Sequence, residues 1–268
     1  MDNKIIICGV GRSGTTYFWQ HLNRVAGPVI NEPFAAWCPD LELRNEVLAL
    51  YQANKLPPRF ADWLGETSTS TINTVVPKLL KMLAAHYPDV RGFKTIDKPF
   101  FNLYRQIWPN CHIIYVTRSL SGRLMAMNRW YEAWLRMPLV PLPTPTHIQF
   151  VIDDFCRQYN VPPSHRDLWC TAIFYTLVDQ YWQKLLPPDA ITVDYGAAVS
   201  EWDITWERIL NHCGIEHSPE KLDQFMPQFP PRDGRNASAP FSLVDVCTAA
   251  EAAHAYSAQS KWEPMTTP

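Results

Sequence analysis

The sequence lacks the features that mark several large classes of protein. No stretch of its 268 residues approaches 18 consecutive apolar residues, and the first apolar run, residues 5–10, is too short for a signal peptide. A formal net charge of −2 argues against general nucleic-acid binding but allows a local basic pocket. The seven cysteines include no C-x-x-C pair and no zinc spacing. We therefore expect reduced thiols, no bound metal, no membrane or nucleic-acid partner, and a cytoplasmic location.

The chain does contain short β-branched runs that alternate with amphipathic segments. Strands are predicted over residues 4–10, 90–95, 112–117 and 190–195. Helices are predicted after the first and third of these strands, and over residues 166–186 and about 203–213. Gly214 is expected to end the last of these helices. This order predicts an α/β fold in three layers, with a mainly parallel central sheet between helices, and a single domain over residues 1–268.

A glycine-rich turn, GVGRSGTT at residues 9–16, separates the first predicted strand from the first helix. Gly9 and Gly14 allow a tight turn with inward-pointing N–H groups, and the helix N-terminus adds its positive dipole end. Such a turn favours an anion, for example a phosphate. Thr15 stands where the G-x-x-x-x-G-K-[ST] pattern of nucleotide triphosphatases has lysine. The pattern therefore favours phosphate binding and counts against ATP hydrolysis.

This turn resembles the 5′-phosphosulfate loop of the sulfotransferases that use 3′-phosphoadenosine 5′-phosphosulfate (PAPS). That family shows [KR]-S-G-T-T in this setting, and Arg12 holds the basic position. Residues 109–118 (PNCHIIYVTR) resemble the family's second nucleotide strand, and residues 92–95 (GFKT) resemble its K-T element. A later strand and helix, from VDY at residues 193–195 to Gly214, also resemble the family. The four elements follow the family order and cover residues 4 to about 222.

The resemblance implies an enzyme that transfers a sulfonate group from PAPS to an acceptor and leaves adenosine 3′,5′-bisphosphate (PAP). It implies a P-loop-like phosphosulfate loop and, at the end of a strand, an arginine that binds the 3′-phosphate. The implied cofactor-binding residues are Gly11, Arg12, Ser13, Gly14, Thr15, Thr16, Arg118 and Tyr195. Arg12 and Lys94 are also implied to be catalytic, and the lysine of the K-T element reaches the transferring sulfonate in this family. The chemistry needs no metal.

The chain departs from the family pattern at three places. Ile96 stands where cytosolic members have a histidine base, and Ala126 stands where they have a serine that helps to hold the 3′-phosphate. Candidates to replace that serine are Ser121, Asn128 and Arg129. The C-terminal Arg-Lys-Gly loop is not evident, and residues 232–235 (RDGR) or 261–262 (KW) are its only stand-ins. These departures keep a non-catalytic, nucleotide-binding homologue as an alternative.

Without that histidine, a carboxylate is the first candidate for the base that takes the acceptor's proton. Residues 31–34 (NEPF) resemble the E-P-[FLW] element of carbohydrate and bacterial sulfotransferases, and in several of these the glutamate is the base. Strand topology would put Glu32 at the carboxyl edge of the sheet, where such folds bind ligands. Asp97, beside the K-T element, and His147, in the proline-rich loop, are the alternatives.

The acceptor is predicted only as a class. Aromatic residues near the motif segments are candidates for a pocket wall, although core packing is the better explanation for any one of them: Trp37, Trp130, Tyr131 and Trp134. Asp153 and Asp154 would favour a cationic acceptor or would simply form a solvated helix face. We predict a small-molecule alcohol, phenol or amine, natural products included. An ATP-dependent P-loop phosphotransferase is the alternative enzyme. The sequence gives no indication of the oligomeric state.

Overall fold

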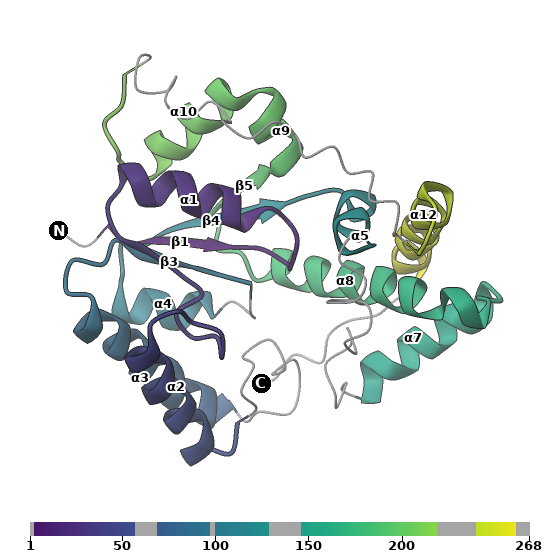
Figure 1. Cartoon of the computed structure of the whole chain (residues 1–268), viewed down its shortest axis with the longest axis horizontal. Helices are drawn as coiled ribbons and strands as arrows, with labels where there is room; N and C mark the ends of the chain where they lie inside the picture. The colour runs from purple at the N-terminus through teal and green to yellow at the C-terminus, as the bar shows by residue number, and fades with distance from the viewer. Residues whose placement is uncertain (1–2, 57–68, 97–99, 129–145, 219–239, 261–268) are drawn as a thin grey trace. The chain divides into compact units, whose positions relative to one another are not determined.

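The computed structural model describes residues 3–56, 69–96, 100–128, 146–218 and 240–260 (Figure 1). The chain divides into two compact units. The first comprises Met1–Trp63, Thr67–Thr117 and Leu185–Pro230, and the second comprises Leu64–Glu66, Arg118–Lys184 and Pro231–Pro268. The single domain that the sequence predicts stays a prediction.

The first unit contains a five-stranded parallel sheet with the order β2-β3-β1-β4-β5. Its strands are β1 (Ile5–Cys8), β2 (Val29–Asn31), β3 (Gly92–Thr95), β4 (His112–Thr117) and β5 (Ile191–Asp194). Four of them lie within the strands predicted from the sequence. The fifth, β2, is missed by the pattern because three residues show no usable periodicity.

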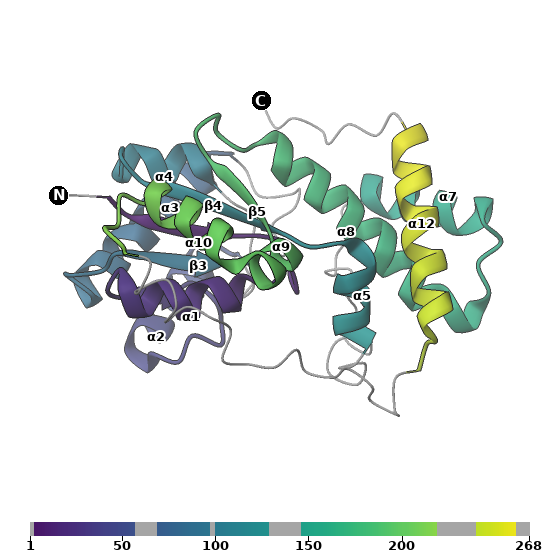
Figure 2. The same ribbon diagram turned by 90° about the horizontal axis from the view of Figure 1, so that it is seen from above.

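Helices cover both faces of this sheet, which confirms the predicted α/β class. Those of the first unit are α1 (Thr15–Val25), α2 (Leu41–Ala53), α3 (Thr69–His86), α4 (Phe101–Ile107), α9 (Tyr195–Ser200) and α10 (Trp202–His212). In Figures 1 and 2, α1 and α10 lie over one face, and α3 and α4 lie over the other. Because successive strand residues point to opposite faces, Ile5 and Ile7 pack with Trp206, whereas Phe93 contacts the rings of Tyr104 and Trp108.

Gly214 ends α10 as predicted. It lies in the left-handed region at φ 62°. Its N–H donates to the Asn211 carbonyl at 3.1 Å, and the Ile215 N–H donates to the Leu210 carbonyl at 2.9 Å. This pair of bonds is a Schellman motif, and it satisfies two carbonyls that the end of a helix leaves without intrahelical partners.

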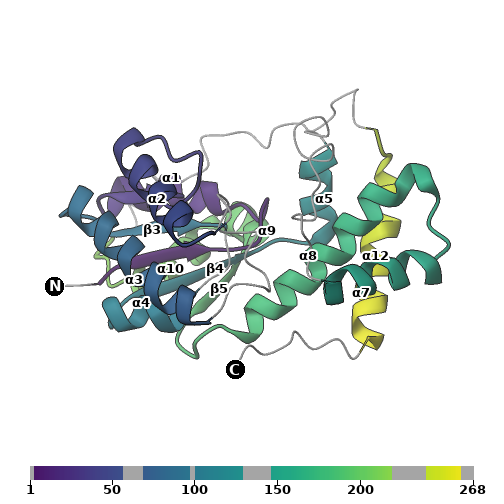
Figure 3. The same cartoon turned by 90° about the horizontal axis from the view of Figure 1, so that it is seen from below.

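The described part of the second unit is helical. It contains α5 (Leu120–Asn128), α7 (Thr146–Gln158), the short 3₁₀ helix η2 (Pro163–His165), α8 (Arg166–Lys184) and α12 (Leu243–Gln259). Helix α8 packs against α5, α7 and α12 (Figure 3), and it confirms the helix predicted over residues 166–186. In the described part of the chain, no helix combines the length and the apolar character needed to cross a membrane.

Candidate functional site

The residues singled out by sequence in the first unit lie at the carboxyl ends of its strands. The glycine-rich loop follows β1, Glu32 follows β2, Lys94 lies near the end of β3, and Tyr195 follows β5. In the register of the sheet, Lys94 is aligned with Ile7 and Asn31. Because the strands are parallel, these segments share one edge of the sheet, which is where open α/β folds bind ligands.

The glycine-rich loop has the backbone of an anion site. Arg12 and Gly14 lie in the left-handed region, at φ 66° and 101°. The Ser13 N–H donates to the Val10 carbonyl at 3.0 Å, which closes the turn. Helix α1 then begins at Thr15 with no side-chain cap and no acidic residue in its first turn. The positive end of the helix dipole is therefore not neutralised by the helix's own side chains.

Close packing leaves no room for side chains at two loop glycines. A Cβ on Gly9 would lie 2.4 Å from the Val116 carbonyl oxygen, and one on Gly14 would lie 2.3 Å from the Tyr195 ring. That ring also contacts Tyr17 edge-on, with centroids 5.7 Å apart. The Ser13 hydroxyl is fully buried and has no hydrogen-bond partner among the described residues. A buried hydroxyl without a hydrogen-bond partner is uncommon in a folded protein.

Glu32 and Lys94 form a buried ion pair beside this loop. The Lys94 Nζ contacts Glu32 Oε1, and the two side chains are only 2% and 9% exposed. The Trp37 indole N–H donates to the other carboxylate oxygen, Oε2. The Glu32 backbone N–H donates to the Lys94 carbonyl at 2.8 Å, which extends the β2–β3 pairing by one bond. The structure thus brings together two residues that lie 62 positions apart in the sequence.

Backbone strain occurs in the same region. Glu32 has φ 46°, and among the described residues only four that are not glycine have a positive φ: Arg12, Glu32, Lys55 and Asn160. Such a conformation costs about 1–3 kcal/mol and persists only where the surroundings enforce it. Here the buried ion pair and the hydrogen bond to the Lys94 carbonyl hold Glu32 in place. Two of the four strained residues are therefore candidate site residues.

Titratable groups close to the loop are held in their neutral forms. Burial lowers the pKa of His21 to about 4, and this imidazole packs against Tyr17 and Trp206. Burial raises the pKa of the Cys8 thiol far above its usual range and, as the main cause, raises the pKa of Tyr17. None of the three is suited to act as a base or nucleophile near neutral pH.

Arg118 is the first residue of the second unit and directly follows β4. Its carbonyl accepts a hydrogen bond from Arg123 Nε at 3.0 Å. Ala126 is buried in α5. Asn128 is one candidate to replace the missing serine, but its side-chain amide bonds the backbone of Phe241. The amide N–H donates to the Phe241 carbonyl at 2.7 Å, and the amide oxygen accepts from the Phe241 N–H at 3.3 Å. Ser121 is half-buried in the first turn of α5.

Other sequence candidates are placed differently from the expectation. His147 lies in the first turn of α7 and not in a proline-rich loop. Asp153 accepts from Arg166 at 2.8 Å, and Asp154 accepts from the Tyr256 hydroxyl at 2.8 Å. Both carboxylates therefore serve helix packing. The remaining candidates lie outside the described residues: Asp97, Arg129, Trp130, Tyr131, Trp134, residues 232–235 and residues 261–262. No cluster of three metal-ligating side chains occurs among the residues described.

The role of Trp37 as a partner of Glu32 was not predicted from the sequence. From the sequence, Trp37 was expected to pack in the core or to form part of a pocket wall. The signal was present, because Trp37 follows the E-P-F element by a few residues and the intervening turn folds back on itself: the Ala35 N–H donates to the Glu32 carbonyl at 3.1 Å. With 45% of its surface exposed, Trp37 can both orient the carboxylate and present a ring to solvent.

No protein-family model and no curated protein matches the sequence. Several solved structures do resemble the chain. Sulfotransferase STF9 from Mycobacterium avium is 12% identical with a TM-score of 0.51, over 98% of this chain and 78% of that one. Mouse sulfotransferase SULT7A1 complexed with PAP is 12% identical with a TM-score of 0.47, over 91% of this chain and 75% of that one. The sulfotransferase domain of the Synechococcus PCC 7002 olefin synthase is 14% identical with a TM-score of 0.41, over 92% of this chain and 93% of that one. The likeness to STF9 shows that this chain has the sulfotransferase fold.

Proposed function

We propose that this chain, which has the sulfotransferase fold, is a PAPS-dependent sulfotransferase acting on a small-molecule acceptor. The observation that carries the proposal is the buried Glu32–Lys94 pair at the same sheet edge as a phosphate loop that lacks the lysine of nucleotide triphosphatases. A cation and a carboxylate in contact there provide the two things that sulfonate transfer needs: stabilisation of developing negative charge and acceptance of a proton.

The loop residues fit a nucleotide phosphate. The left-handed backbone at Arg12 and Gly14, the uncapped start of α1 and the absence of room for side chains at Gly9 and Gly14 support this assignment. We assign the 5′-phosphosulfate end to residues 11–16 and the 3′-phosphate to Arg118. Tyr195, whose ring rests on Gly14, borders the same loop. Bound PAPS would supply the sulfonate group and leave as PAP.

Each residue of the Glu32–Lys94–Trp37 set has a separate task. Lys94 and Arg12 provide positive charge for the sulfonate oxygens. Glu32 accepts the proton of the acceptor's hydroxyl or amine, since a carboxylate has about four lone-pair sites and its two bonded neighbours occupy only two. Trp37 fixes the carboxylate's orientation through its N–H. In this arrangement, a cation and an indole N–H hold the carboxylate base in one orientation, as a positioned catalytic group requires.

A small alcohol, phenol or amine, natural products included, is the acceptor that fits this site best. The partly exposed Trp37 ring adjoins the proposed base, so a flat or ring-shaped acceptor could stack on it while its polar group reaches Glu32. All seven cysteines are free thiols, which supports a reducing, cytoplasmic location.

Arg118→Ala is expected to weaken PAP binding by about 10- to 100-fold, since a hydrogen bond to a charged group is worth about 1.5–3 kcal/mol. Titration calorimetry with PAP measures this loss of affinity, and a parallel titration with ATP and Mg²⁺ tests the alternative nucleotide. The matched control is Arg157→Ala, because Arg157 forms an exposed ion pair in the same unit. Binding of ATP and not PAP would replace this proposal with phosphoryl transfer.

Gly14→Ala is expected to reduce PAP affinity by at least about tenfold. An alanine there would be strained at φ 101° and its Cβ would collide with the Tyr195 ring, and left-handed backbone alone costs about 1–2 kcal/mol. Gly27→Ala is the control, because Gly27 has a similar φ of 95° but contacts only the flexible Arg91 side chain. Equal PAP affinity in both variants, by the same calorimetric titration, would remove the loop from the proposed nucleotide site.

A further inference from the structure

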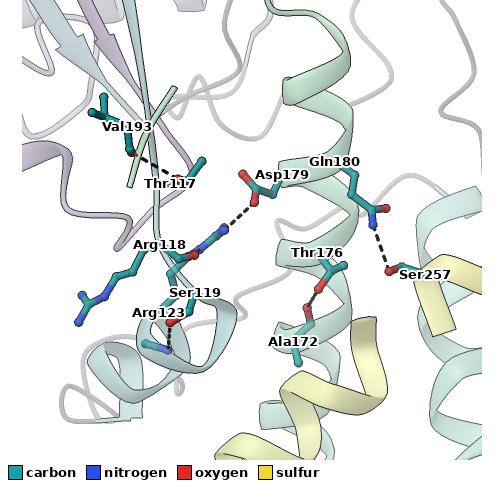
Figure 4. A network of polar contacts seen from close by, with 11 residues as sticks. Thr117, Arg118, Ser119, Arg123, Ala172, Thr176, Asp179, Gln180, Val193 and Ser257 are labelled. Atoms are coloured by element: carbon teal, nitrogen blue, oxygen red, sulfur yellow. Dashed lines mark hydrogen bonds and ion pairs between the residues drawn. The ribbon is translucent and has the colours of Figure 1, made fainter. Parts of the chain in front are cut away.

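The second unit contains a buried ion pair that the proposed chemistry does not use. Arg123 of α5 and Asp179 of α8 meet through Arg123 Nη2 and Asp179 Oδ2 at 2.6 Å, with side chains 5% and 14% exposed (Figure 4). Taking two charges out of water is expensive, and a pair that only joins two helices could be replaced by apolar side chains at no loss of stability. The pair therefore calls for a role beyond joining α5 to α8.

Arg123 contacts Arg118 as well as Asp179. Its Nε–H donates to the Arg118 carbonyl at 3.0 Å, so one planar guanidinium bonds the backbone of Arg118 and the carboxylate of α8 at once. In Figure 4 the Arg118 guanidinium points away from this pair. Because Asp179 neutralises Arg123, the positive charge of Arg118 is not opposed by a second uncompensated arginine five residues away.

The first turn of α5 also supports the Arg118 side chain. The Gly122 N–H donates to Ser119 Oγ at 3.2 Å, which caps the helix. A Cβ on Gly122 would lie 2.8 Å from Ser119 Oγ, 3.0 Å from Arg118 Nε and 3.5 Å from Arg118 Cγ. The Arg118 side chain thus passes directly over Gly122. Its backbone is held by Arg123, and its side chain rests on a surface that glycine keeps flat.

From these contacts we infer that Arg123 and Asp179 are positioning residues for Arg118, and that they set the preference of the protein for a nucleotide bearing a 3′-phosphate. The inference rests on the proposed function, in which Arg118 binds that phosphate. Without Asp179 the buried Arg123 guanidinium has to turn toward water to recover its solvation, and it then releases the Arg118 carbonyl.

The test compares the affinities for PAP and for adenosine 5′-phosphate, by titration calorimetry on the full chain. The ratio of the two affinities isolates the 3′-phosphate, because general damage to the fold lowers both. Asp179→Asn is expected to lower the ratio about tenfold, toward the value of Arg118→Ala, and Asp179→Glu should restore part of it. Asp153→Asn is the matched control, since it breaks an exposed Asp–Arg pair of the same unit and should leave the ratio unchanged.

Gly122→Ala provides a second variant in which loss of the fold is not expected. Alanine is a better helix former than glycine, which offsets the contact of its Cβ with the Ser119 hydroxyl. The same Cβ displaces the Arg118 side chain, so the ratio should fall several-fold. Ratios that stay at the wild-type value in Asp179→Asn and Gly122→Ala would overturn the inference and leave the proposed function intact. A wild-type protein that binds both nucleotides equally would instead overturn the proposed function itself.

Discussion

Replacing Glu32 with glutamine is expected to lower the turnover number about 10²- to 10⁴-fold, the usual contribution of a positioned general base. Glutamine keeps the size of the side chain, and its single carbonyl oxygen can still accept from one of the two donors, Lys94 or Trp37, so the surrounding packing survives better than in an alanine variant. PAP affinity should change little, because in the proposed mechanism the carboxylate contacts the acceptor and not the nucleotide. The measurement is the rate of PAP release from PAPS with 2-naphthol or tyramine as probe acceptor.

The control for this experiment is Glu46→Gln, which removes the carboxylate of a partly exposed pair with His86 in the same unit. Unchanged turnover in Glu32→Gln would assign the base elsewhere, and Asp97→Asn is then the next variant to measure. A wild-type protein that binds PAP but sulfonates neither these probes nor a wider panel of alcohols and amines would favour the non-catalytic homologue.

Lys94→Met is expected to destabilise the protein by about 3–5 kcal/mol, because it leaves the buried Glu32 carboxylate without its cation. Methionine retains most of the volume of the lysine stem, so the loss reports on charge more than on packing. The double variant Lys94→Met/Glu32→Gln should recover most of that stability, since neither charge then remains unpaired. It should not recover turnover. Urea unfolding of the single and double variants measures the coupling.

The exposed pair Arg105–Asp189 supplies the comparison, with side chains 31% and 67% exposed. Arg105→Met is expected to cost no more than about 1 kcal/mol, as for surface ion pairs in general. Equal losses of unfolding free energy in Arg105→Met and Lys94→Met would contradict the burial argument. Recovery of turnover in the double variant would remove both Glu32 and Lys94 from the chemistry.

The sequence predicted the framework of the fold because its signals are local. Runs such as IIIC in β1 and HIIYVT in β4 are continuous and β-branched, as buried parallel strands require. The glycine-rich loop lies between such a strand and a helix, and the tight turn of its backbone is permitted by Gly9 and Gly14, which belong to the loop itself. Gly214 ended its helix where expected, because a left-handed residue suffices for that motif.

Residues that act through distant partners were predicted less well. His147 was assigned to a loop because the prolines before it mask the start of α7. Asn128 was a candidate phosphate ligand, yet it bonds the backbone of Phe241, 113 residues away. Asp153 and Asp154 suggested either a cationic acceptor or a solvated helix face, and each also bonds a residue of another helix of the second unit, Arg166 and Tyr256 respectively. Hydrogen-bond partners of this kind depend on helix packing, which sequence spacing does not encode.

The sequence by itself determined the α/β class, the loop that suits a phosphate and the candidates Glu32, Lys94 and Arg118, because strand character, glycine geometry and motif order are properties of short segments. Only the tertiary structure decided that Glu32 and Lys94 pair, that Trp37 bonds the same carboxylate and that Arg123 holds the Arg118 carbonyl. The physical reason is that β2 and β3 are adjacent in the sheet although 60 residues separate them in the chain, so their alignment depends on the folded core.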